Sequence, residues 1–194
     1  MTVTIPLFPL NAVLFPGGVM PLRVFEPRYL DMVSNSLRND IAIGVVLIKE
    51  GRETGQAPNT FNVGTLSTIS YWNRRPDGLL GVTLRGTQRF HITAQTVQPN
   101  QLILAEIEPL PNIPTITVPP RYRSLSDLLR KIMTQLEPPY CTIQAFYDDL
   151  EWVSARLCEL LPLPLPLKQE LLMSDDTLHR IECLHASMQQ VEAV

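Results

Sequence analysis

The sequence predicts an α+β fold, in which a bent sheet curls toward an open barrel, contains one inserted helix and precedes a helical bundle. Residues 1–110 contain several segments with strand-like alternation and one segment with helical spacing. Residues 111–120 form a proline-rich connector, and residues 121–194 place apolar residues at helical spacing. We therefore expect a sheet subdomain and a helical subdomain on either side of the connector.

The first predicted strand is TIPLFPL at residues 4–10, in which Pro6 and Pro9 indicate an edge position or irregular pairing. FPGG at 15–18 is typical of a tight turn. The alternation of apolar residues over 20–24 predicts a second strand.

A helix is predicted over residues 27–38, because Pro27 suits a first helical position and leaves Glu26 as the N-cap. Phe25 and Leu30 have the spacing of a hydrophobic staple. The buried stripe of this helix is expected to comprise Leu30, Val33 and Leu37, with Met32 beside it.

On the solvent side of the same helix, Arg28 and Asp31 are expected to form an ion pair. This placement treats both residues as surface residues.

Further strands follow. IAIGVVLI at 41–48 is apolar on both faces, which is typical of a strand covered on both sides. Residues 61–94 predict a long hairpin whose turn is RPDG at 75–78. Another strand is expected over 102–108.

The outgoing arm of the hairpin alternates. Its apolar face is expected to carry Leu80, Val82, Leu84, Phe90 and Ile92. Its polar face is expected to carry Thr83, Arg85, Thr87, Arg89, His91 and Thr93. Because the alternation continues across Gly86, we expect a bend there and no one-residue bulge.

In the helical subdomain, the first helix is indicated by the stripe Leu125, Leu128, Leu129, Ile132, Met133 and Leu136. A second helix is expected over 142–161, then an extended LPLPLPL link and a short helix over 167–172. The last helix is expected to follow Ser174 as N-cap, with the stripe Leu178, Ile181, Leu184 and Met188.

Composition limits the classes of partner. The net charge is −3, so we expect no nucleic-acid partner. Charged residues make up 18% of the chain, against about 25% in typical domains. The sparse charge leaves apolar surface for partners, although a loop-rich fold would explain it equally well.

The cysteines indicate the compartment. Cys141, Cys158 and Cys183 lack a C-x-x-C spacing, so we expect reduced thiols and a cytoplasmic protein. No segment predicts a signal peptide or a membrane span.

Motifs of catalysis are missing from the sequence. It contains no phosphate-binding loop, dinucleotide-binding glycine motif, nucleophile elbow or zinc-protease motif, so we assign no catalytic residue, cofactor or metal. His91 is expected to be solvated, and the spacing of His179 and His185 does not suit a metal pair on one helix face.

Two surface features are candidates for binding a partner. The hairpin end YWNRRPDG offers residue types that anchor interfaces, namely Tyr71, Trp72, Arg74 and Arg75. The alternative is that Trp72 packs against the sheet beside two solvated arginines. The face carrying Arg85 and Arg89 could hold an anion or RNA, although pairing with acidic side chains on a neighbouring strand is the stronger expectation.

Several segments, in order, resemble the N-terminal domain of Lon proteases. They are IPLFPLNAVLFPGGVMPLRVFEPRYLDMV, FNVGTLSTI, DGLLGVTLRGTQRFHI and, for its helical end, LPLPLPLKQELLMSDDTLHRIECL. The resemblance implies a PUA-like β pseudo-barrel followed by helices. It also implies a standalone substrate-binding-type domain that lacks the ATPase and Ser-Lys protease parts of Lon, and therefore a protein that is not an enzyme.

The resemblance implies a binding module for unfolded polypeptides or partner proteins, with a role in protein turnover. We expect an exposed apolar patch, either in a groove between the subdomains or near Trp72. An RNA-binding PUA-like protein is the alternative, which the acidic net charge disfavours. The sequence leaves the oligomeric state open.

Overall fold

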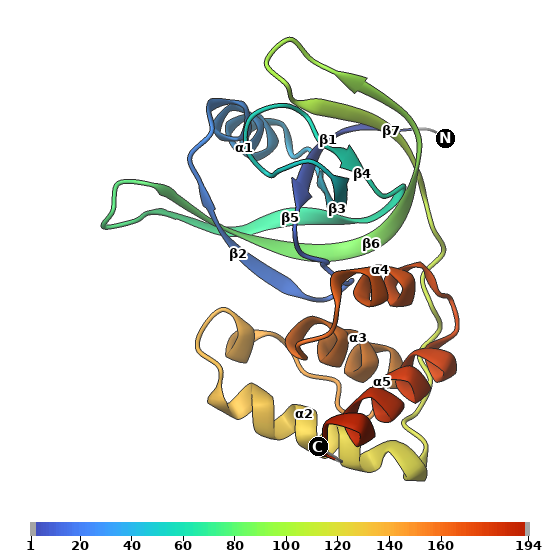
Figure 1. The fold of residues 1–194 in the computed structure, drawn as a ribbon. Coiled ribbons are helices and arrows are strands. Elements are labelled where there is room, and N and C mark those ends of the chain that lie inside the picture. The colour runs from blue at the N-terminus through green and yellow to red at the C-terminus, as the bar shows by residue number, and fades with distance from the viewer. Residues whose placement is uncertain (1–2, 193–194) are drawn as a thin grey trace. The chain divides into compact units, whose positions relative to one another are not determined.

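The computed structural model describes residues 3–192, with the side chains of 3–188 (Figure 1). The chain divides into two compact units, residues 1–111 and 112–194, which we call the sheet unit and the helical unit.

The described part of the sheet unit, residues 3–111, contains seven strands and one helix. They are β1 (Val3–Leu10), β2 (Val19–Val24), α1 (Pro27–Asn39), β3 (Ile43–Glu50), β4 (Asn59–Thr60), β5 (Val63–Arg74), β6 (Leu80–Val97) and β7 (Ile103–Pro109). The strands predicted over 41–48 and 102–108, and the long hairpin with its turn at 75–78, are confirmed.

The strand pairings close into a circuit. The first half of β1 pairs with β7 in antiparallel orientation, and its second half pairs with β3 in parallel orientation. The circuit therefore runs β1-β7-β6-β5-β3 and back to β1, while β2 is attached to β6 and β4 to β3. The irregular pairing expected from Pro6 and Pro9 is confirmed, since each proline lies in a different half of β1. The PUA-like assignment stays a prediction.

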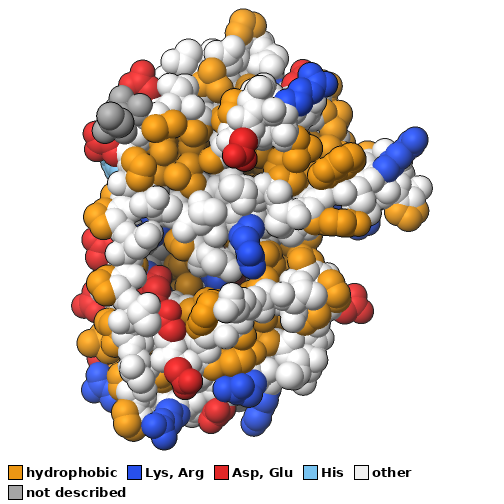
Figure 2. Space-filling view, turned by 180° about the vertical axis from the view of Figure 1, so that it is seen from behind, with side chains coloured by type: hydrophobic (Ala, Val, Ile, Leu, Met, Phe, Trp, Pro, Cys, Tyr) orange, Lys and Arg blue, Asp and Glu red, His pale blue; other side chains and the backbone are white. Residues whose placement is uncertain are grey.

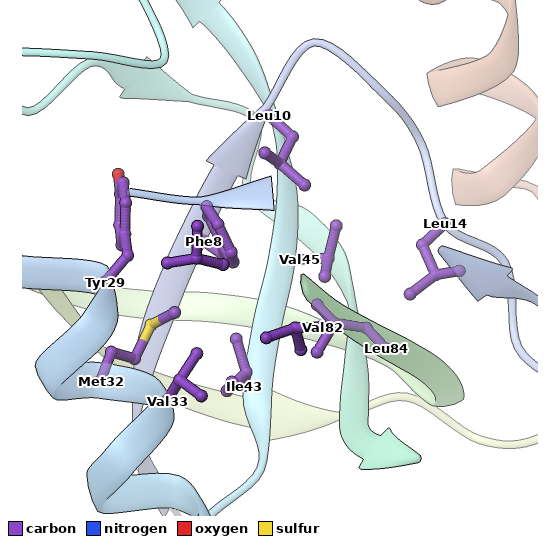
Figure 3. Close-up of a cluster of buried hydrophobic side chains, with 11 residues drawn as sticks. Phe8, Leu10, Leu14, Tyr29, Met32, Val33, Ile43, Val45, Val82 and Leu84 are labelled. Carbon is purple, nitrogen blue, oxygen red and sulfur yellow. The ribbon is translucent and has the colours of Figure 1, made fainter. Parts of the chain in front are cut away.

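The sheet unit has two hydrophobic clusters. The first joins α1 to the sheet, and Figure 3 shows Met32 and Val33 of the helix directed toward Ile43 and Val82. In the same cluster the ring of Tyr29 stacks on that of Phe8, with 4.4 Å between centroids. The second cluster comprises Ile5, Leu7, Val46, Phe90, Ile92, Ile103, Ala105 and Ile107.

Glycine is required where β5 crosses the second cluster. A Cβ on Gly64 would lie 2.6 Å from Cγ1 of Val46 and 2.9 Å from Cζ of Phe90, and closer still to the carbonyl oxygen of Val45. These contacts leave no space for a larger side chain.

Helix α1 confirms the predicted segment and its first-turn proline, and Met32 and Val33 are buried as expected, but the rest of the buried face differs from the prediction. The buried side chains are Arg28, Tyr29, Met32, Val33 and Ser36. Leu30 is 36% exposed and Leu37 is 44% exposed, so the expectation that they are buried is wrong. The stack of Tyr29 on Phe8 explains the difference, because adjacent helix positions differ by about 100° in direction and packing of Tyr29 turns Leu30 outward.

Strand β6 contains a bulge that was not expected. Leu66 lies opposite Gln88 and Ser67 lies opposite Gly86, so Thr87 is an extra residue and the predicted bulge-free bend is wrong. The main chain of Gly86 exchanges hydrogen bonds of 2.9 Å with Gly17 and Gly18 in the FPGG turn. This tertiary contact explains the shift in pairing.

The two faces of β6 are confirmed in part. Leu84, Phe90 and Ile92 are buried and His91 is exposed, as expected. Thr83, expected on a solvated face, is buried.

The helical unit consists of η1 (Pro120–Tyr122), α2 (Arg123–Gln135), η2 (Tyr140–Thr142), α3 (Leu150–Leu160), α4 (Leu165–Met173) and α5 (Thr177–Glu192). On α2, the predicted stripe is confirmed at its centre, since Leu125, Leu129 and Met133 are buried. Helix α3 begins eight residues later than the predicted 142. The reason is that Asp149 caps it, accepting a 3.0 Å hydrogen bond from the N–H of Glu151.

The last two helices also differ from the prediction at their starts. Helix α4 begins within LPLPLPL, because its proline lies in the first turn, so the extended link is shorter than expected. Ser174 is the C-cap of α4. Asp176 caps α5 by accepting a 3.0 Å hydrogen bond from the N–H of His179. Leu178, expected to be buried, is 38% exposed.

A buried arginine joins the helices of this unit. Arg180 is fully buried and its Nη1 lies 2.6 Å from Oε2 of Glu151 on α3. Its other nitrogens donate to the carbonyl oxygens of Leu171 and Ser174. A polar network therefore occupies positions that the apolar spacing alone would not predict.

Candidate functional site

Three strand segments project from the circuit as a small sheet, which we call the arm. It consists of Thr68–Arg74 of β5, Leu80–Arg85 of β6 and Val19–Val24 of β2. Figure 1 shows the β5–β6 hairpin reaching away from the rest of the sheet unit. Strand β3 pairs with β5 only as far as Ser67. In the described residues, both outer strands of the arm therefore pair on one side only.

The aromatic side chains predicted as a site lie on opposite faces of the arm. In the β5–β6 pairing, Trp72 lies opposite Val82 and Tyr71 lies opposite Thr83. Since successive residues of a strand point to opposite faces, the two rings do not form one patch. Trp72 is 57% exposed and Tyr71 is 61% exposed, so Trp72 is not packed away against the sheet.

The two arginines of the predicted site also separate. Arg74 is exposed and lies on the same face as Trp72, two residues along β5. Arg75 lies in the turn, where its Nε is 3.2 Å from Oδ2 of Asp77. A hydrogen bond from the N–H of Leu79 and the contact with Arg75 lower the pKa of Asp77. In Figure 2 the hairpin end at the right carries both hydrophobic and cationic side chains.

The second predicted feature, an arginine face on β6, is not formed. Arg85 is exposed, but Arg89 is only 3% exposed and its Nη2 donates to the carbonyl oxygen of Pro111 at 3.4 Å. The segment that follows β7 covers this position, which explains why strand alternation alone misplaced Arg89.

A hollow of about 200 Å³ lies beside the outer edge of β2. Its apolar lining comprises Phe8, Leu10, Leu22, Val24, Phe25 and Tyr29, and its polar lining includes Arg23, Glu26 and Glu53. Phe25 is 55% exposed. No local sequence pattern predicts this hollow, because its walls come from β1, β2, α1 and the loop that precedes β4.

One buried guanidinium ties the walls of the hollow together. Arg28 is 4% exposed and donates to the carbonyl oxygens of Gln101 at 2.8 Å and Glu53 at 3.3 Å. Its Nη2 also lies 3.1 Å from Oε2 of Glu26. The prediction that Arg28 forms a surface ion pair with Asp31 is therefore wrong. The sequence offered no local sign of this role, since the acceptors lie 25 and 73 residues away.

The environment of Tyr29 is apolar on one side and cationic on the other. The Arg28 guanidinium lies 4.5 Å from the centre of its ring. Burial raises the pKa of the Tyr29 hydroxyl to about 12, although the positive charge of Arg28 opposes the shift. The ring is therefore neutral and serves as an apolar wall of the hollow at ordinary pH.

No cluster of three or more metal-ligating side chains occurs among the residues that the structure describes. In the same part of the chain, no helix is both long enough and apolar enough to span a membrane. His179 and Cys183 approach each other on α5, with 3.5 Å between Nε2 and Sγ. The features that the structure brings together at the arm are apolar side chains and open strand edges, which suit recognition of another chain.

The chain matches the family described as the ATP-dependent protease La (LON) substrate-binding domain over residues 4–190. Lon protease of Escherichia coli strain K12 is 29% identical over 199 residues, which cover 96% of this chain and 25% of that protein. Lon protease of Buchnera aphidicola subsp. Schizaphis graminum is 27% identical over 200 residues, with the same shares. The chain thus spans about a quarter of the length of these relatives.

Solved structures show the same fold. The Lon N-terminal domain protein from Xanthomonas campestris superposes with a TM-score of 0.77 at 34% identity, covering 95% of this chain and 98% of that one. The N-terminal domain of a Mycobacterium avium complex Lon protease superposes with a TM-score of 0.63 at 16% identity, which shows likeness of fold alone. On the match over residues 4–190, this chain belongs to the LON substrate-binding domain family.

Proposed function

We propose that this domain binds unfolded polypeptides, or exposed segments of partner proteins, through the arm and the apolar side chains around it, and that it acts in protein turnover without being an enzyme. The observation that carries the proposal is the combination of large exposed apolar side chains with two strand edges that pair with no other strand in the described structure. The family description, a substrate-binding domain of a protease, supports it.

The size of the exposed apolar contribution can be estimated. Phe25, Leu30, Leu37 and Trp72 of the sheet unit are between 36% and 57% exposed. Complete burial of such a side chain contributes about 1.5–3 kcal/mol, so burying the exposed half of all four would contribute roughly 3–6 kcal/mol. Since 4.1 kcal/mol corresponds to a dissociation constant of about 1 mM, apolar contact alone supports weak binding. Main-chain hydrogen bonds or repeated contacts along an unfolded chain would strengthen it.

The RNA-binding alternative gains no support from the site. It depended on a cationic face with Arg85 and Arg89, and Arg89 is buried. The net charge of −3 opposes it as well.

The proposal can be tested by fluorescence anisotropy with labelled, reduced and carboxymethylated α-lactalbumin, which stays unfolded in buffer. We expect binding of this probe but not of native α-lactalbumin or a single-stranded RNA 20-mer. Trp72→Ala should weaken binding about threefold, corresponding to the loss of roughly 0.7 kcal/mol of contact. Phe146→Ala is the matched control, because Phe146 is an aromatic side chain of similar exposure, 47%, on the helical unit.

Equal binding of folded and unfolded α-lactalbumin, or no binding of either, would contradict the proposal. An equal loss of affinity in Trp72→Ala and Phe146→Ala would contradict the role of the arm in binding.

A further inference from the structure

Building on the proposed function, we infer how the polypeptide is held: it adds as an extended strand to the outer edge of β2 and inserts one large apolar side chain into the neighbouring hollow, with a basic residue close to that side chain. The occupant is a polypeptide in extended conformation, because only a main chain can satisfy a row of strand-edge donors and acceptors.

The first step concerns the edge of β2. Within residues 3–192, its only strand partner is β6, with Leu22 opposite Val82 and Pro21 opposite Thr83. Proline has no N–H to give to a ladder, so its position must face away from β6. In an antiparallel pair the main-chain groups of alternate residues share a direction, and those of Arg23 therefore face outward with those of Pro21.

The edge of β2 offers few main-chain hydrogen-bonding groups, which suits a ligand that binds transiently. Beside the hollow, the outward row offers the N–H of Arg23 and the carbonyl oxygens of Pro21 and Arg23, but Pro21 contributes no donor. A proline on an open edge discourages indefinite strand pairing. The edge can therefore accept a short extended segment without building a continuous sheet.

The hollow supplies the side-chain contact. It lies directly along Pro21–Val24, and Phe25, Tyr29 and Phe8 form its apolar walls. Its volume of about 200 Å³ is below the roughly 300–1,000 Å³ of pockets that take drug-sized ligands. A single leucine, methionine or phenylalanine side chain is the occupant that matches this size and lining.

The charges around the hollow indicate which residue type should lie next to the inserted side chain of the bound polypeptide. Glu26 is neutralised by Arg28 at 3.1 Å. Arg23 places a positive charge on the β2 side of the hollow, and Glu53 lies on its loop side. Glu53 accepts a 2.6 Å hydrogen bond from the N–H of Asn11, and no ion pair to it is found in the described residues. The loop side of the hollow is therefore acidic, which complements lysine or arginine on the bound strand.

The test uses a fluorescein-labelled nonapeptide, Ser-Thr-Lys-Thr-Leu-Thr-Lys-Thr-Ser, and its anisotropy on titration with the full chain. Two N-methylated versions remove amide donors from the odd or the even residues. Because strand pairing has a period of two, one version should lose about tenfold or more in affinity while the other stays within about twofold. Equal effects of the two versions would overturn strand addition.

Side-chain recognition is tested with variants that keep the fold. Phe25→Ala should weaken binding of the leucine peptide about fivefold. Phe146→Ala, which truncates a phenylalanine of similar exposure that does not line the hollow, should change this affinity by less than about twofold. Replacing both lysines of the peptide by glutamate should weaken binding about threefold or more, and Glu53→Gln should abolish that preference while keeping the acceptor for Asn11.

The outcomes separate this inference from the proposed function. If unfolded α-lactalbumin binds but the nonapeptide does not, strand addition is overturned and polypeptide binding stands. The same conclusion follows if neither Phe25→Ala nor N-methylation changes the affinity for the nonapeptide. If neither probe binds, both are overturned. Equal affinity for the lysine and glutamate peptides would refute the charge preference and with it the assigned role of Glu53.

Discussion

Replacement of Arg28 by methionine removes a buried charge from the wall of the hollow while keeping most of the side-chain volume. In the native chain this guanidinium donates to the carbonyl oxygens of Gln101 at 2.8 Å and Glu53 at 3.3 Å. It also neutralises Glu26 at 3.1 Å. Methionine can make none of these contacts, so the loop that carries Glu53 loses its hydrogen bond from Arg28 but keeps those from Gly55 to Glu26 and from Ala57 to Gln101.

The expected loss of stability follows from these contacts. A hydrogen bond to a charged group contributes about 1.5–3 kcal/mol to the free energy of unfolding. A buried acceptor that is left without a donor lowers it by about 1–3 kcal/mol. The Glu26 side chain is 19% exposed and can recover some hydration, so its part of the loss is small. Removing one partner of a buried pair typically costs about 3–5 kcal/mol. We expect about 3 kcal/mol for Arg28→Met, the lower end of this range.

Urea unfolding followed by circular dichroism measures the free energy of unfolding, with Arg38→Met as the matched control. Arg38 lies in the last turn of the same helix and is exposed, so its replacement should change stability by less than about 0.5 kcal/mol. Hydrogen exchange of the segment 51–57 should accelerate in Arg28→Met only. A loss below about 1 kcal/mol with unchanged exchange in this segment would refute the role assigned to Arg28.

Three further variants test the fold around the site. Gly64→Ala should destabilise the chain by about 1–3 kcal/mol in thermal or urea unfolding, because the added methyl group would overlap Phe90 and its neighbours; a neutral effect would contradict the packing. Asp149→Ala should cost about 1 kcal/mol through loss of the α3 cap to Glu151, and Asp149→Asn should restore most of it. The pKa of Tyr29 is raised from 10.0 to about 12, so between these values the unfolded state loses a proton that the folded state keeps, and stability should fall as pH rises. Tyr29→Phe should lack this alkaline fall in urea titrations at several pH values; an identical fall would assign it to other groups.

Local interactions account for the elements that could be predicted. Helix α1 begins at Pro27 because proline suits a first helical turn, and β3 has no polar side chain from Ile43 to Ile48 because both of its faces are covered there. The turn at 75–78 follows from Pro76 and Gly78, which has a φ of 81°. In each case the cause lies within a few residues of the element itself.

Helix starts in the helical unit were less predictable, because several residues there can act as caps. Ser174 and Asp176 are both suitable N-cap types, and only the structure shows that Asp176 caps α5 while Ser174 ends α4. The start of α3 at Leu150 depends on a distant contact, since the Leu150 N–H donates to the carbonyl oxygen of Ile116 at 2.7 Å.

The candidate site was predictable only in part. Trp72 and Tyr71 could be named from composition and turn chemistry, because a hairpin end with aromatic residues is recognisable locally. Their separation onto opposite faces depends on register, and register depends on the bulges in the β5–β6 pairing. Phe25 could be placed before the helix, but its exposure beside a hollow could not.

The amino-acid sequence by itself determined the order of strands and helices, the hairpin turn and the likeness to the Lon family, since these follow from short-range spacing and ordered local motifs. Only the tertiary structure decided which face of α1 is buried, that Arg28 is an internal anchor, and that β2 keeps an open edge beside a hollow. The physical reason is that burial and open edges are set by contacts between segments far apart in the chain, such as Phe8 with Tyr29. A spacing pattern limits those contacts without choosing among them.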